Sequence, residues 1–491
     1  TTLLTPEALG EVIIPWGTTT LCVDAMEIAN VAGIDGLLAM IKDSEKLPFR
    51  LLLEIPSRVP TAPGLETTGG VLGVEDVTQL LELDEAVSLG ELDPSKVLGT
   101  KEEYLEKVLA SLNRRKICNG HAIGLGVDDL NIYAAGHLSD DHESVYYEEL
   151  LERLRLGIMP LIREGSSERN VDTLVPGIVK NNLPTDNMMF CTDDKHVNDI
   201  FKEGHISYNV KRSIELGLDP VQAIQMATIN AAKHFRLEDK IGSVAPGRFA
   251  DILLIDDLTT MKPKLVLKSG RIVADENGAR PVPEKAYPEK LFDTVHIGAD
   301  FSAEKFIIHS EGKRAKCRVI DLIKDQIINK EIFEWMDVKE GQIAADVDRD
   351  ILKLAVVERY GKNGRVSTAL VHGFGLKQGA LAASVSHDHH NIVVGTNDRD
   401  MAVCVEKLQE LHGGFVSAVE GQVVDALALP LGGLMSTLPA KTVMKRMDEM
   451  NGAVEKMGCP MKAPFMSLSF ISLPTVPELG LTDFGLIDVL G

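Results

Sequence analysis

Residues 116–142 read KICNGHAIGLGVDDLNIYAAGHLSDDH and contain two periods of the pattern that decides the fold. A short apolar run, 116–118, is followed closely by His121, and a second run, 137–139, is followed closely by His142. Runs of this length and composition are typical of buried parallel strands. Each run therefore predicts a strand whose carboxyl end carries a residue able to bind a metal or move a proton.

The same pattern continues on both sides of this stretch. Apolar residues recur at spacings of three and four between most of the runs, for example at 102–114, 148–155 and 199–216, which predicts helices packed outside a sheet. The predicted strands are 18–23, 49–55, 86–89, 116–118, 137–139, 157–162 and 188–192. This repeated alternation favours an α/β fold, a TIM-like (β/α)8 barrel, over a doubly wound sheet.

A chain of 491 residues exceeds what one hydrophobic core usually holds, so we expect more than one domain. The opening lacks a methionine and already follows a helix-like pattern, so we expect the first barrel strand to precede Thr1 and residues 1–240 to supply strands two to eight. The strand-like runs and the Pro-Gly turn within 241–280 predict a small β-domain. The pattern of 292–491 predicts a carboxyl-terminal α+β domain.

The charge of the chain limits its partners. A formal net charge of -22 and a pI near 5.1 argue against nucleic acid or an anionic membrane as a partner, because both would be repelled. No apolar stretch approaches the roughly 20 residues that cross a bilayer, and the first residues lack the basic region of a signal peptide. We therefore expect a cytoplasmic protein that acts on a small neutral or cationic molecule.

Four residues at predicted strand ends suggest a metal centre. Imidazole nitrogens suit zinc, iron or manganese, so His121 and His142 at successive strand ends could share an ion, with Glu91 and Asp193 from other strands. Glu91 could bridge two ions through its two oxygens. The alternative for each histidine is a hydrogen-bonded loop residue, and for Glu91 a solvated loop carboxylate.

Several carboxylates have both a chemical and a structural interpretation. Asp193 could take a proton from an activated water and return it to a leaving amine, whereas Asp194 is the better candidate for capping the following helix. Asp24 and Glu27 could bind substrate, and Glu27 could also take part in catalysis. The alternative for both residues is to cap and solvate the following helix. The remaining polar strand ends, Glu54, Arg163 and Glu164, stay unassigned. Arg163 and Glu164 could equally form a salt bridge at the rim of the barrel.

Other histidines give weaker signals. We interpret His196 and His205 as loop or capping residues. In the last domain, SHDHHN places His387, Asp388, His389 and His390 beside a predicted strand. Adjacent side chains of a strand point in alternate directions, so a metal site made by this tract alone is the less favoured interpretation.

An ordered set of motifs resembles one known family. GTTTLCVDAMEIANVAG, LGE, GHAIGL, SDDHES, LIREGS, FCTDDKHVNDIFKEGHI, MATINAAKHF and IGSVAPGRFADILLIDDL are similar to the bacterial and archaeal adenine deaminases of the amidohydrolase superfamily. The segment VSHDHHNIVVGTND resembles the carboxyl-terminal domain peculiar to that family. The resemblance covers essentially the whole chain.

The resemblance implies hydrolysis of adenine to hypoxanthine and ammonia, a step of purine salvage, at a site with two divalent ions, manganese, iron or zinc. It implies that Glu91 is a bridging carboxylate, that His121 and His142 are ligands, and that Asp193 shuttles protons. It also implies a homodimer or a larger homo-oligomer.

The chain departs from the family at two points. The family's His-x-His pair corresponds to a position before Thr1, and Met26 stands where the family has an active-site histidine. Met cannot move a proton or donate the hydrogen bond of a neutral imidazole. Two alternatives therefore stay open: an amidohydrolase of another aminopurine or a cyclic amide, and a purine-binding relative with weakened catalysis.

Overall fold

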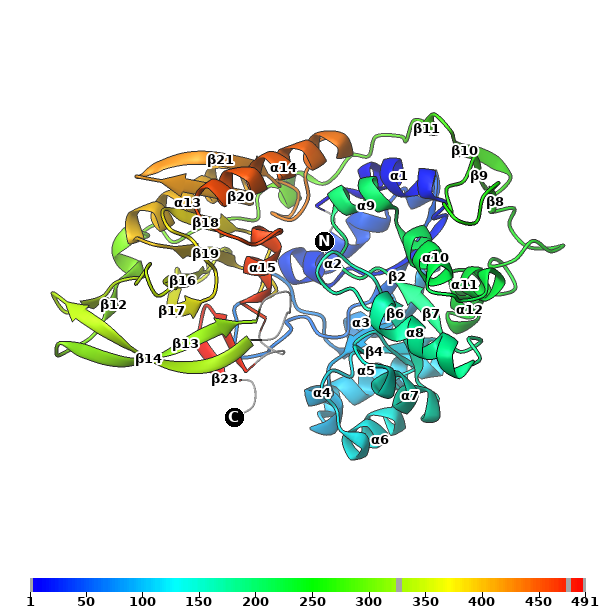
Figure 1. The fold of residues 1–491 in the computed structure, drawn as a ribbon, viewed down its shortest axis with the longest axis horizontal. Helices are drawn as coiled ribbons and strands as arrows, with labels where there is room; N and C mark the ends of the chain where they lie inside the picture. The colour runs from blue at the N-terminus through cyan, green and yellow to red at the C-terminus, as the bar shows by residue number, and fades with distance from the viewer. Residues whose placement is uncertain (1–2, 324–328, 474–477, 489–491) are drawn as a thin grey trace. The chain divides into compact units, whose positions relative to one another are not determined.

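The computed structural model describes residues 3–323, 329–473 and 478–488 (Figure 1). These residues form two compact units. The first, here called the barrel unit, runs to Met26 and includes Leu37–Arg58 and Leu72–Ala286. The second, the sheet unit, comprises Glu27–Gly36, Val59–Val71 and the chain from Tyr287 onward. The expected range 1–240 therefore contains two excursions, 27–36 and 59–71, that belong to the other unit; the first lies within a helix, Met26–Ile41, and no break in the local sequence pattern marks either of them.

Parallel strands form the frame of the barrel unit. Neighbours β1 to β4 pair in sequence order, and β5, β6 and β7 do the same. The backbone nitrogen of Ser139 donates to the carbonyl of Cys118 over 2.8 Å and joins the two groups. The strands are β1 (Thr20–Asp24), β2 (Arg50–Ile55), β3 (Ala86–Leu92), β4 (Ile117–Gly120), β5 (Asp140–Asp141), β6 (Met159–Arg163) and β7 (Met189–Cys191). Six of the seven predicted strands are confirmed near their expected positions. The prediction of a strand at 137–139 is wrong, because His137 has a turn conformation with φ 62° and the short strand β5 begins only after this run.

One cluster of apolar side chains shows that this row of strands curves around a common interior. Its members come from β1, β2, β3, β4, β6 and β7 and include Cys22, Leu52, Val87, Ile117, Leu161 and Met189, with Phe235 below them. Side chains of a flat sheet this wide could not meet in one cluster. The expected TIM-barrel-like arrangement is therefore confirmed for the described strands. Because side chains alternate along a strand, Asp24 and Glu54 face the same interior, two residues closer to the carboxyl ends.

Helices follow most strands and pack outside them (Figure 1). A second cluster joins Leu174 and Ile178 of one helix with Met226 of another against Ile162 and Phe190. The barrel-unit helices are α1 (Pro6–Ile13), α3 (Val74–Leu80), α4 (Pro94–Leu98), α5 (Glu102–Asn113), α6 (Val127–Ala135), α7 (Tyr147–Arg155), α8 (Val171–Asn181), α9 (Val197–Glu203), α10 (Ile206–Glu215), α11 (Pro220–Met226) and α12 (Ile229–His234), with the 3-10 turns η1 (Ile14–Trp16) and η2 (Ser44–Lys46).

Two segments with a continuous apolar spacing, one of them the helix predicted at 199–216, are each divided into two helices. The segment 199–216 is divided between α9 and α10 at Gly204, which has φ 108° and lies so close to Trp16 that a Cβ would come within 3.1 Å of its ring. The segment 220–234 is divided between α11 and α12 around Thr228. In both places the apolar spacing continues across the break, so periodicity alone cannot locate it.

A small antiparallel sheet completes the barrel unit. Its strand order is β11-β10-β9-β8, which joins segments within 252–279. The strands are β8 (Ile252–Leu254), β9 (Leu265–Lys268), β10 (Arg271–Asp275) and β11 (Gly278–Ala279). The strand-like runs predicted within 241–280 therefore form a sheet, and that sheet belongs to the barrel unit.

The sheet unit is built on one ten-stranded sheet of order β12-β15-β14-β13-β17-β16-β19-β18-β20-β21. Helix α13 packs Met401, Val405 and Leu408 against Ala355, Val393 and other residues of its central strands. The strands are β12 (Ile308–His309), β13 (Arg314–Leu322), β14 (Asn329–Lys339), β15 (Gln342–Ile343), β16 (Ile351–Val357), β17 (Val366–His372), β18 (Ala380–Ala383), β19 (Asn391–Gly395), β20 (Gly414–Val419) and β21 (Gln422–Ala428), and a hairpin adds β22 (Leu479–Thr482) and β23 (Gly485–Asp488). The helices are α13 (Asp398–Glu410), α14 (Ala440–Lys456) and α15 (Pro464–Phe470), with η3 (Glu289–Phe292) and η4 (Ala303–Phe306).

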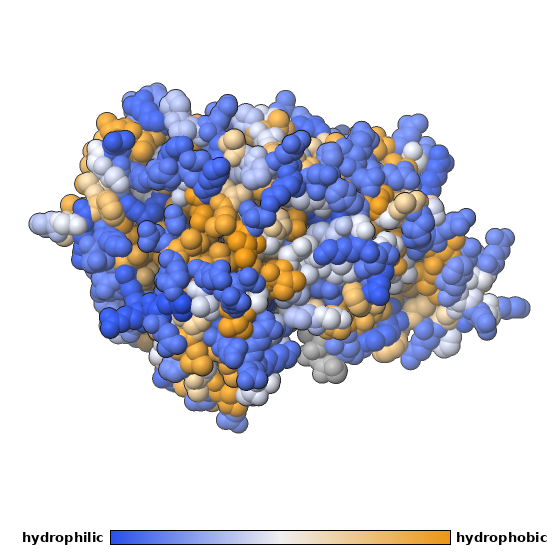
Figure 2. Space-filling model, turned by 180° about the vertical axis from the view of Figure 1, so that it is seen from behind, coloured by the Kyte–Doolittle hydropathy of each residue, from blue (hydrophilic) through white to orange (hydrophobic). Residues whose placement is uncertain are grey.

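The hydrophilic character of the surface agrees with the charged composition of the chain. Figure 2 shows a face on which hydrophilic side chains predominate and hydrophobic side chains gather in smaller areas. Within 3–323, 329–473 and 478–488, none of the helices combines the length and the apolar character needed to cross a membrane.

Candidate metal centre

The carboxyl ends of three neighbouring strands bring Glu91, His121 and His142 together. The Glu91 carboxylate oxygen Oε2 lies 3.6 Å from Nδ1 of His121 and 3.4 Å from Nε2 of His142. Glu143, which follows His142, places Oε1 3.4 Å from the same nitrogen of His121 and 3.1 Å from that of His142. Two imidazoles and two carboxylates therefore converge on a small volume at the mouth of the barrel.

These donors suit a divalent cation. Ligand atoms of Glu91, His121 and His142 all lie within 4.8 Å of one another, and so do those of His142, Glu143 and Asp193. Both ring nitrogens of His121 are buried and have no hydrogen-bond partner, although buried polar atoms are normally satisfied. A metal ion would give His121 the missing partner. Nitrogen and carboxylate oxygen together are donors that zinc, iron and manganese accept.

Sequence reasoning missed Glu143. The signal was present in SDDHES, where a carboxylate directly follows the candidate histidine, but alternation along a strand would point neighbours to opposite sides. Strand β5 ends at Asp141, so this alternation does not extend to His142 and Glu143. Both side chains therefore turn toward the same volume.

Arg163 holds two of the carboxylates. Its Nη1 donates to Glu143 Oε1 and to Asp193 Oδ2, each over 2.8 Å, and its Nη2 donates to Glu143 Oε2 over 3.1 Å. Glu164, the other half of the alternative rim salt bridge, instead pairs with Arg169 over 2.7 Å. Arg163 thus belongs to the metal centre as the residue that orients Glu143 and Asp193.

The charges of this cluster are strongly coupled. Burial alone would lower the pKa of His142, but its hydrogen bond with Glu143 and the charges of Glu143 and Glu91 outweigh burial and raise this pKa to about 10. Burial alone would raise the pKa of Glu91, but Arg58, His121 and His142 lower it well below its usual range. The cluster therefore favours added positive charge, and a metal ion would compete with protons for it.

Two buried aspartates position His121 without facing it. Asp140 accepts from the backbone nitrogen of Gly120 over 2.9 Å, and Asp141 accepts from that of Ala122 over 2.7 Å. Asp141 also accepts from Nε of Arg153 over 2.8 Å. These bonds fix the backbone on both sides of His121, so the two aspartates of SDDHES act structurally.

The predicted residue Asp24 lies at the end of β1 and braces β3. Its Oδ2 accepts from the backbone nitrogen of Glu91 over 3.3 Å. A Cβ at Gly90 would lie 2.3 Å from the same oxygen, so only glycine leaves room for this carboxylate. Glu54, in register with Asp24, has its pKa raised well above the usual range by burial and by the charges of Asp24, Asp140 and Glu91. Two further carboxyl groups therefore lie inside the barrel, near the carboxyl ends of β1 and β2.

Three predictions have different outcomes. Glu27 lies in the first turn of α2 (Met26–Ile41), in a segment of the sheet unit, and its substrate-binding and catalytic parts stay predictions. Asp194 was expected to cap the next helix, which is wrong: α9 has His196 at its N-cap position and no side-chain cap bond, because Asp194 lies two residues too early. His205 is buried and bonds through Nδ1 to Oγ1 of Thr18 over 3.0 Å, in keeping with a structural part.

The SHDHHN tract is used in packing. His390 Nε2 pairs with Asp483 Oδ1 over 3.3 Å, and the ring of His387 stacks on Phe470 at 4.5 Å. Tyr360 donates its hydroxyl to the carbonyl of His389 over 2.8 Å. Among the described residues, the groups able to hold a metal do not include this tract.

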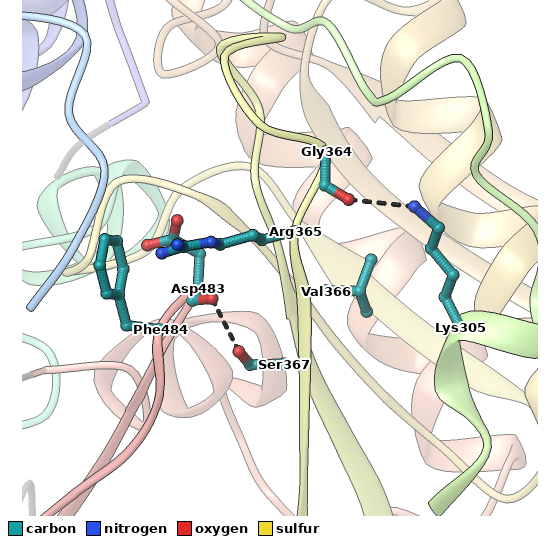
Figure 3. A pocket seen from close by; sticks show the side chains of 7 residues that line it. All are labelled: Lys305, Gly364, Arg365, Val366, Ser367, Asp483 and Phe484. Atoms are coloured by element: carbon teal, nitrogen blue, oxygen red, sulfur yellow. Dashed lines mark hydrogen bonds between the residues drawn. The ribbon is translucent and has the colours of Figure 1, made fainter.

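The sheet unit also contains an open hollow of about 540 Å³, which Figure 3 shows from close by. Lys305 donates to the carbonyl of Gly364 over 3.1 Å and pairs with Asp300 over 2.7 Å, and Ser367 donates to the carbonyl of Asp483 over 2.8 Å. These polar groups are engaged with one another. The convergence of donor atoms, rather than the size of a hollow, therefore places the candidate site in the barrel unit.

Comparison with known proteins gives matches over both parts of the chain. The profile of the Amidohydrolase family matches residues 1–273, and the profile of the Adenine deaminase C-terminal domain matches residues 326–490. The chain is 58% identical to a protein named Adenine deaminase from Desulforamulus reducens over 491 residues, which are all of this chain and 84% of that protein. It is 40% identical to an Adenine deaminase from Methanococcoides burtonii, over 96% of this chain and 80% of that one. A solved structure of a beta-aspartyl dipeptidase from Fervidobacterium islandicum is 18% identical, with a TM-score of 0.42 over 57% of this chain and 79% of that one.

Proposed function

The chain belongs to the amidohydrolase family, and on this premise we propose that it hydrolyses adenine to hypoxanthine and ammonia at the mouth of its barrel unit. The observation that carries the proposal is the convergence of Glu91, His121, His142 and Glu143 on one volume, where the ring nitrogens of His121 make no hydrogen bond with any other described residue. Full-length similarity to proteins named adenine deaminase supports adenine as the substrate.

The proposed cofactor is a divalent metal ion held by Glu91, His121, His142 and Glu143, with Asp193 within reach. Manganese, iron and zinc all suit these donors, and the resemblance implies two ions. When bound, such an ion lowers the pKa of a water molecule toward neutrality and so supplies a nucleophile.

Asp193 is the proposed proton carrier. Its carboxylate accepts hydrogen bonds from Arg163 and from the backbone nitrogen of Asp194, each over 2.8 Å, and it keeps part of its surface exposed. An ionised, oriented carboxylate can accept a proton from the attacking water. It can then return that proton to the amino group on C6 of adenine, so that the C6–N bond breaks, ammonia leaves and the new C6–O bond remains.

Two carboxyl groups inside the barrel are candidates for substrate contacts. Asp24 and the carboxyl group of Glu54 face the interior at the carboxyl ends of β1 and β2. A group that keeps its proton, as the raised pKa of Glu54 favours, can both donate and accept hydrogen bonds. We propose that Asp24 and Glu54 take part in binding the planar, neutral purine. For Glu27, which lies in the sheet unit, substrate binding stays a separate prediction.

Met26 favours a second candidate function. It stands where the resemblance implies a histidine, and its side chain is buried. A thioether donates no hydrogen bond to the polar edge of adenine, so another aminopurine or a cyclic amide is the second candidate, and a purine-binding protein with weakened catalysis is the third. A panel of these compounds in the ammonia assay, with binding measured in parallel, separates the three.

We also propose a homodimer or larger homo-oligomer, as the resemblance implies. Sedimentation velocity of the metal-loaded protein at two concentrations tests it. A single species with the mass of one chain would contradict this proposal.

The principal test measures ammonia release and the spectral change from adenine to hypoxanthine with metal-loaded protein, expressed with all residues that its gene encodes. Asp193→Asn should lower kcat by about 100-fold or more, because it removes a proton carrier. Asp194→Asn is the matched control and should retain most of the activity. Absence of ammonia from a metal-loaded preparation would overturn the proposal.

A further inference from the structure

Arg58 is the cation nearest to the candidate metal centre that the function proposed above does not use. It follows β2 and is 3% exposed. Its Nη2 donates to Oε1 of Glu91, and its Nη1 donates to Oδ2 of Asp93 over 3.1 Å. The guanidinium therefore occupies one oxygen of the same carboxylate whose other oxygen, Oε2, faces His121 and His142.

The surroundings keep this guanidinium in place. Asp93 is 2% exposed and also pairs with Lys96 over 3.5 Å and accepts from Ser95 over 2.5 Å. Ser57, the neighbour of Arg58, donates to the carbonyl of Glu91 over 2.5 Å. Arg58 and Lys96 together balance Glu91 and Asp93, so a swing of Arg58 away from Glu91 would leave a buried carboxylate without its cation, which is costly.

A carboxylate that bridges two metal ions must offer one oxygen to each. Here a permanently charged guanidinium holds Oε1. A second ion at Oε1 would have to displace this guanidinium from a nearly dry site. The two cations would also repel each other strongly at contact distance, because buried charges are weakly screened.

We propose that Arg58 serves as a fixed cation in the place where a bridging Glu91 would hold one of two metal ions, so that Glu91 offers Oε2 alone to a single divalent ion. This inference rests on the proposed metal centre and differs from the two ions that the resemblance implies. Arg58 is thus a positioning residue that sets the metal content of the site.

The test uses Mn²⁺ with the protein expressed with all residues that its gene encodes. Metal content per chain is measured after removal of free metal, and electron paramagnetic resonance separates an isolated Mn²⁺ from an exchange-coupled pair. We expect the unmodified protein to hold one Mn²⁺ with the spectrum of an isolated ion. A coupled pair in this protein would overturn the proposal.

Variants separate the charge of Arg58 from its structural part. Arg58→Lys keeps a cation at Glu91 and should still hold one isolated ion. Arg58→Met removes the cation and should bind a second ion, with a coupled spectrum. Lys96→Met is the matched control, because Lys96 contacts Asp93 and its replacement keeps the contact between Arg58 and Glu91. This variant should hold one isolated ion, as the unmodified protein does.

A Met variant that stays at one ion would overturn the proposal, and so would a Lys variant that gains a second. If Arg58→Met does not fold, the spectra of the unmodified protein and of Arg58→Lys decide the question. Ammonia release from adenine is recorded separately. A protein with one isolated ion and no deaminase activity would contradict the proposed function while leaving the inference about Arg58 intact.

Discussion

Two arginines determine how the carboxylates of the metal centre are oriented. Arg163 connects Glu143 with Asp193, and Arg58 connects Glu91 with Asp93. Each arginine is nearly fully buried, so each pair lies in a region where charges interact strongly. The carboxylates of the candidate site are therefore held by buried cations.

The first prediction at this scale concerns Glu143. Glu143→Gln should lower the affinity for a divalent ion by about 10- to 100-fold, because an amide neither carries the charge nor keeps both bonds to Arg163. Competition with a chelator measures this affinity. The exposed Glu148→Gln on α7 is the matched control. Equal affinities of the two variants would show that Glu143 is not a ligand.

The second prediction concerns His205. Burial, together with the charge of Lys195, lowers the pKa of His205 to about 3, against an ordinary value of about 6.5. Between these values the unfolded chain binds a proton that the folded chain does not, so the free energy of unfolding falls as the pH decreases. This contribution is fully present above pH of about 6.5 and should be lost at up to about 1.4 kcal/mol per pH unit below it.

Urea denaturation at pH 7 and pH 4.5 measures this dependence. His205→Gln should lose less free energy of unfolding between the two pH values than the unmodified protein. His196, whose pKa burial lowers to about 4, contributes in the same window and is present in both proteins, so the difference isolates His205. The exposed His309→Gln is the control; a pH dependence equal in all three proteins would contradict the prediction.

At the scale of elements, the site depends on close contacts between strand ends. The loop after β4 is held through Asp140 and Asp141 of β5, and the end of β3 is held through Asp24 of β1. Gly90 has no side chain in the way of the last contact. The ligands therefore depend on the register of four strands and not only on their own rotamers.

Gly90→Ala should disturb this arrangement. The added Cβ would lie 2.3 Å from Oδ2 of Asp24 and 3.1 Å from the carbonyl of Ile55, so β1 and β3 must separate or Asp24 must move. We expect metal affinity to fall by about 10-fold or more through displacement of Glu91, which isothermal titration with Mn²⁺ measures. Gly452→Ala within α14, where a Cβ meets no atom within 4 Å, should leave metal binding unchanged and stabilise the helix by about 0.5–1 kcal/mol. Unchanged binding in Gly90→Ala would refute this account of Asp24.

At the scale of the whole molecule, metal binding should stabilise one unit selectively. A ligand that binds only the folded state at 100 times its Kd adds about 2.7 kcal/mol to the free energy of unfolding. All proposed ligands lie in the barrel unit. Hydrogen exchange with Mn²⁺ and after chelation should therefore show increased protection in β3, β4 and the segment after β5. Strand β16 of the sheet unit is the internal reference, and a loss of protection there as large as in β3 would contradict this prediction.

Sequence reasoning predicted the barrel strands and the residue types at their ends because both are local properties. Apolar runs and their spacing identify strands and outer helices from neighbouring residues alone. It failed where distant packing decides: at Gly204, where the neighbourhood of Trp16 requires a break, and at the excursions 27–36 and 59–71, which belong to the sheet unit. Glu27 was treated as a barrel residue for the same reason, although the unit boundary falls between it and Met26.

The sequence by itself determined a barrel-like α/β frame whose strand ends carry histidines and carboxylates, because alternation and apolar spacing act over a few residues. Only the tertiary structure decided which atoms meet. It added Glu143 to the donors and placed Arg163 between Glu143 and Asp193. It also placed the guanidinium of Arg58 against Oε1 of Glu91. The physical reason is that curvature of the barrel brings distant strand ends within contact distance, where burial makes each charge depend on its neighbour.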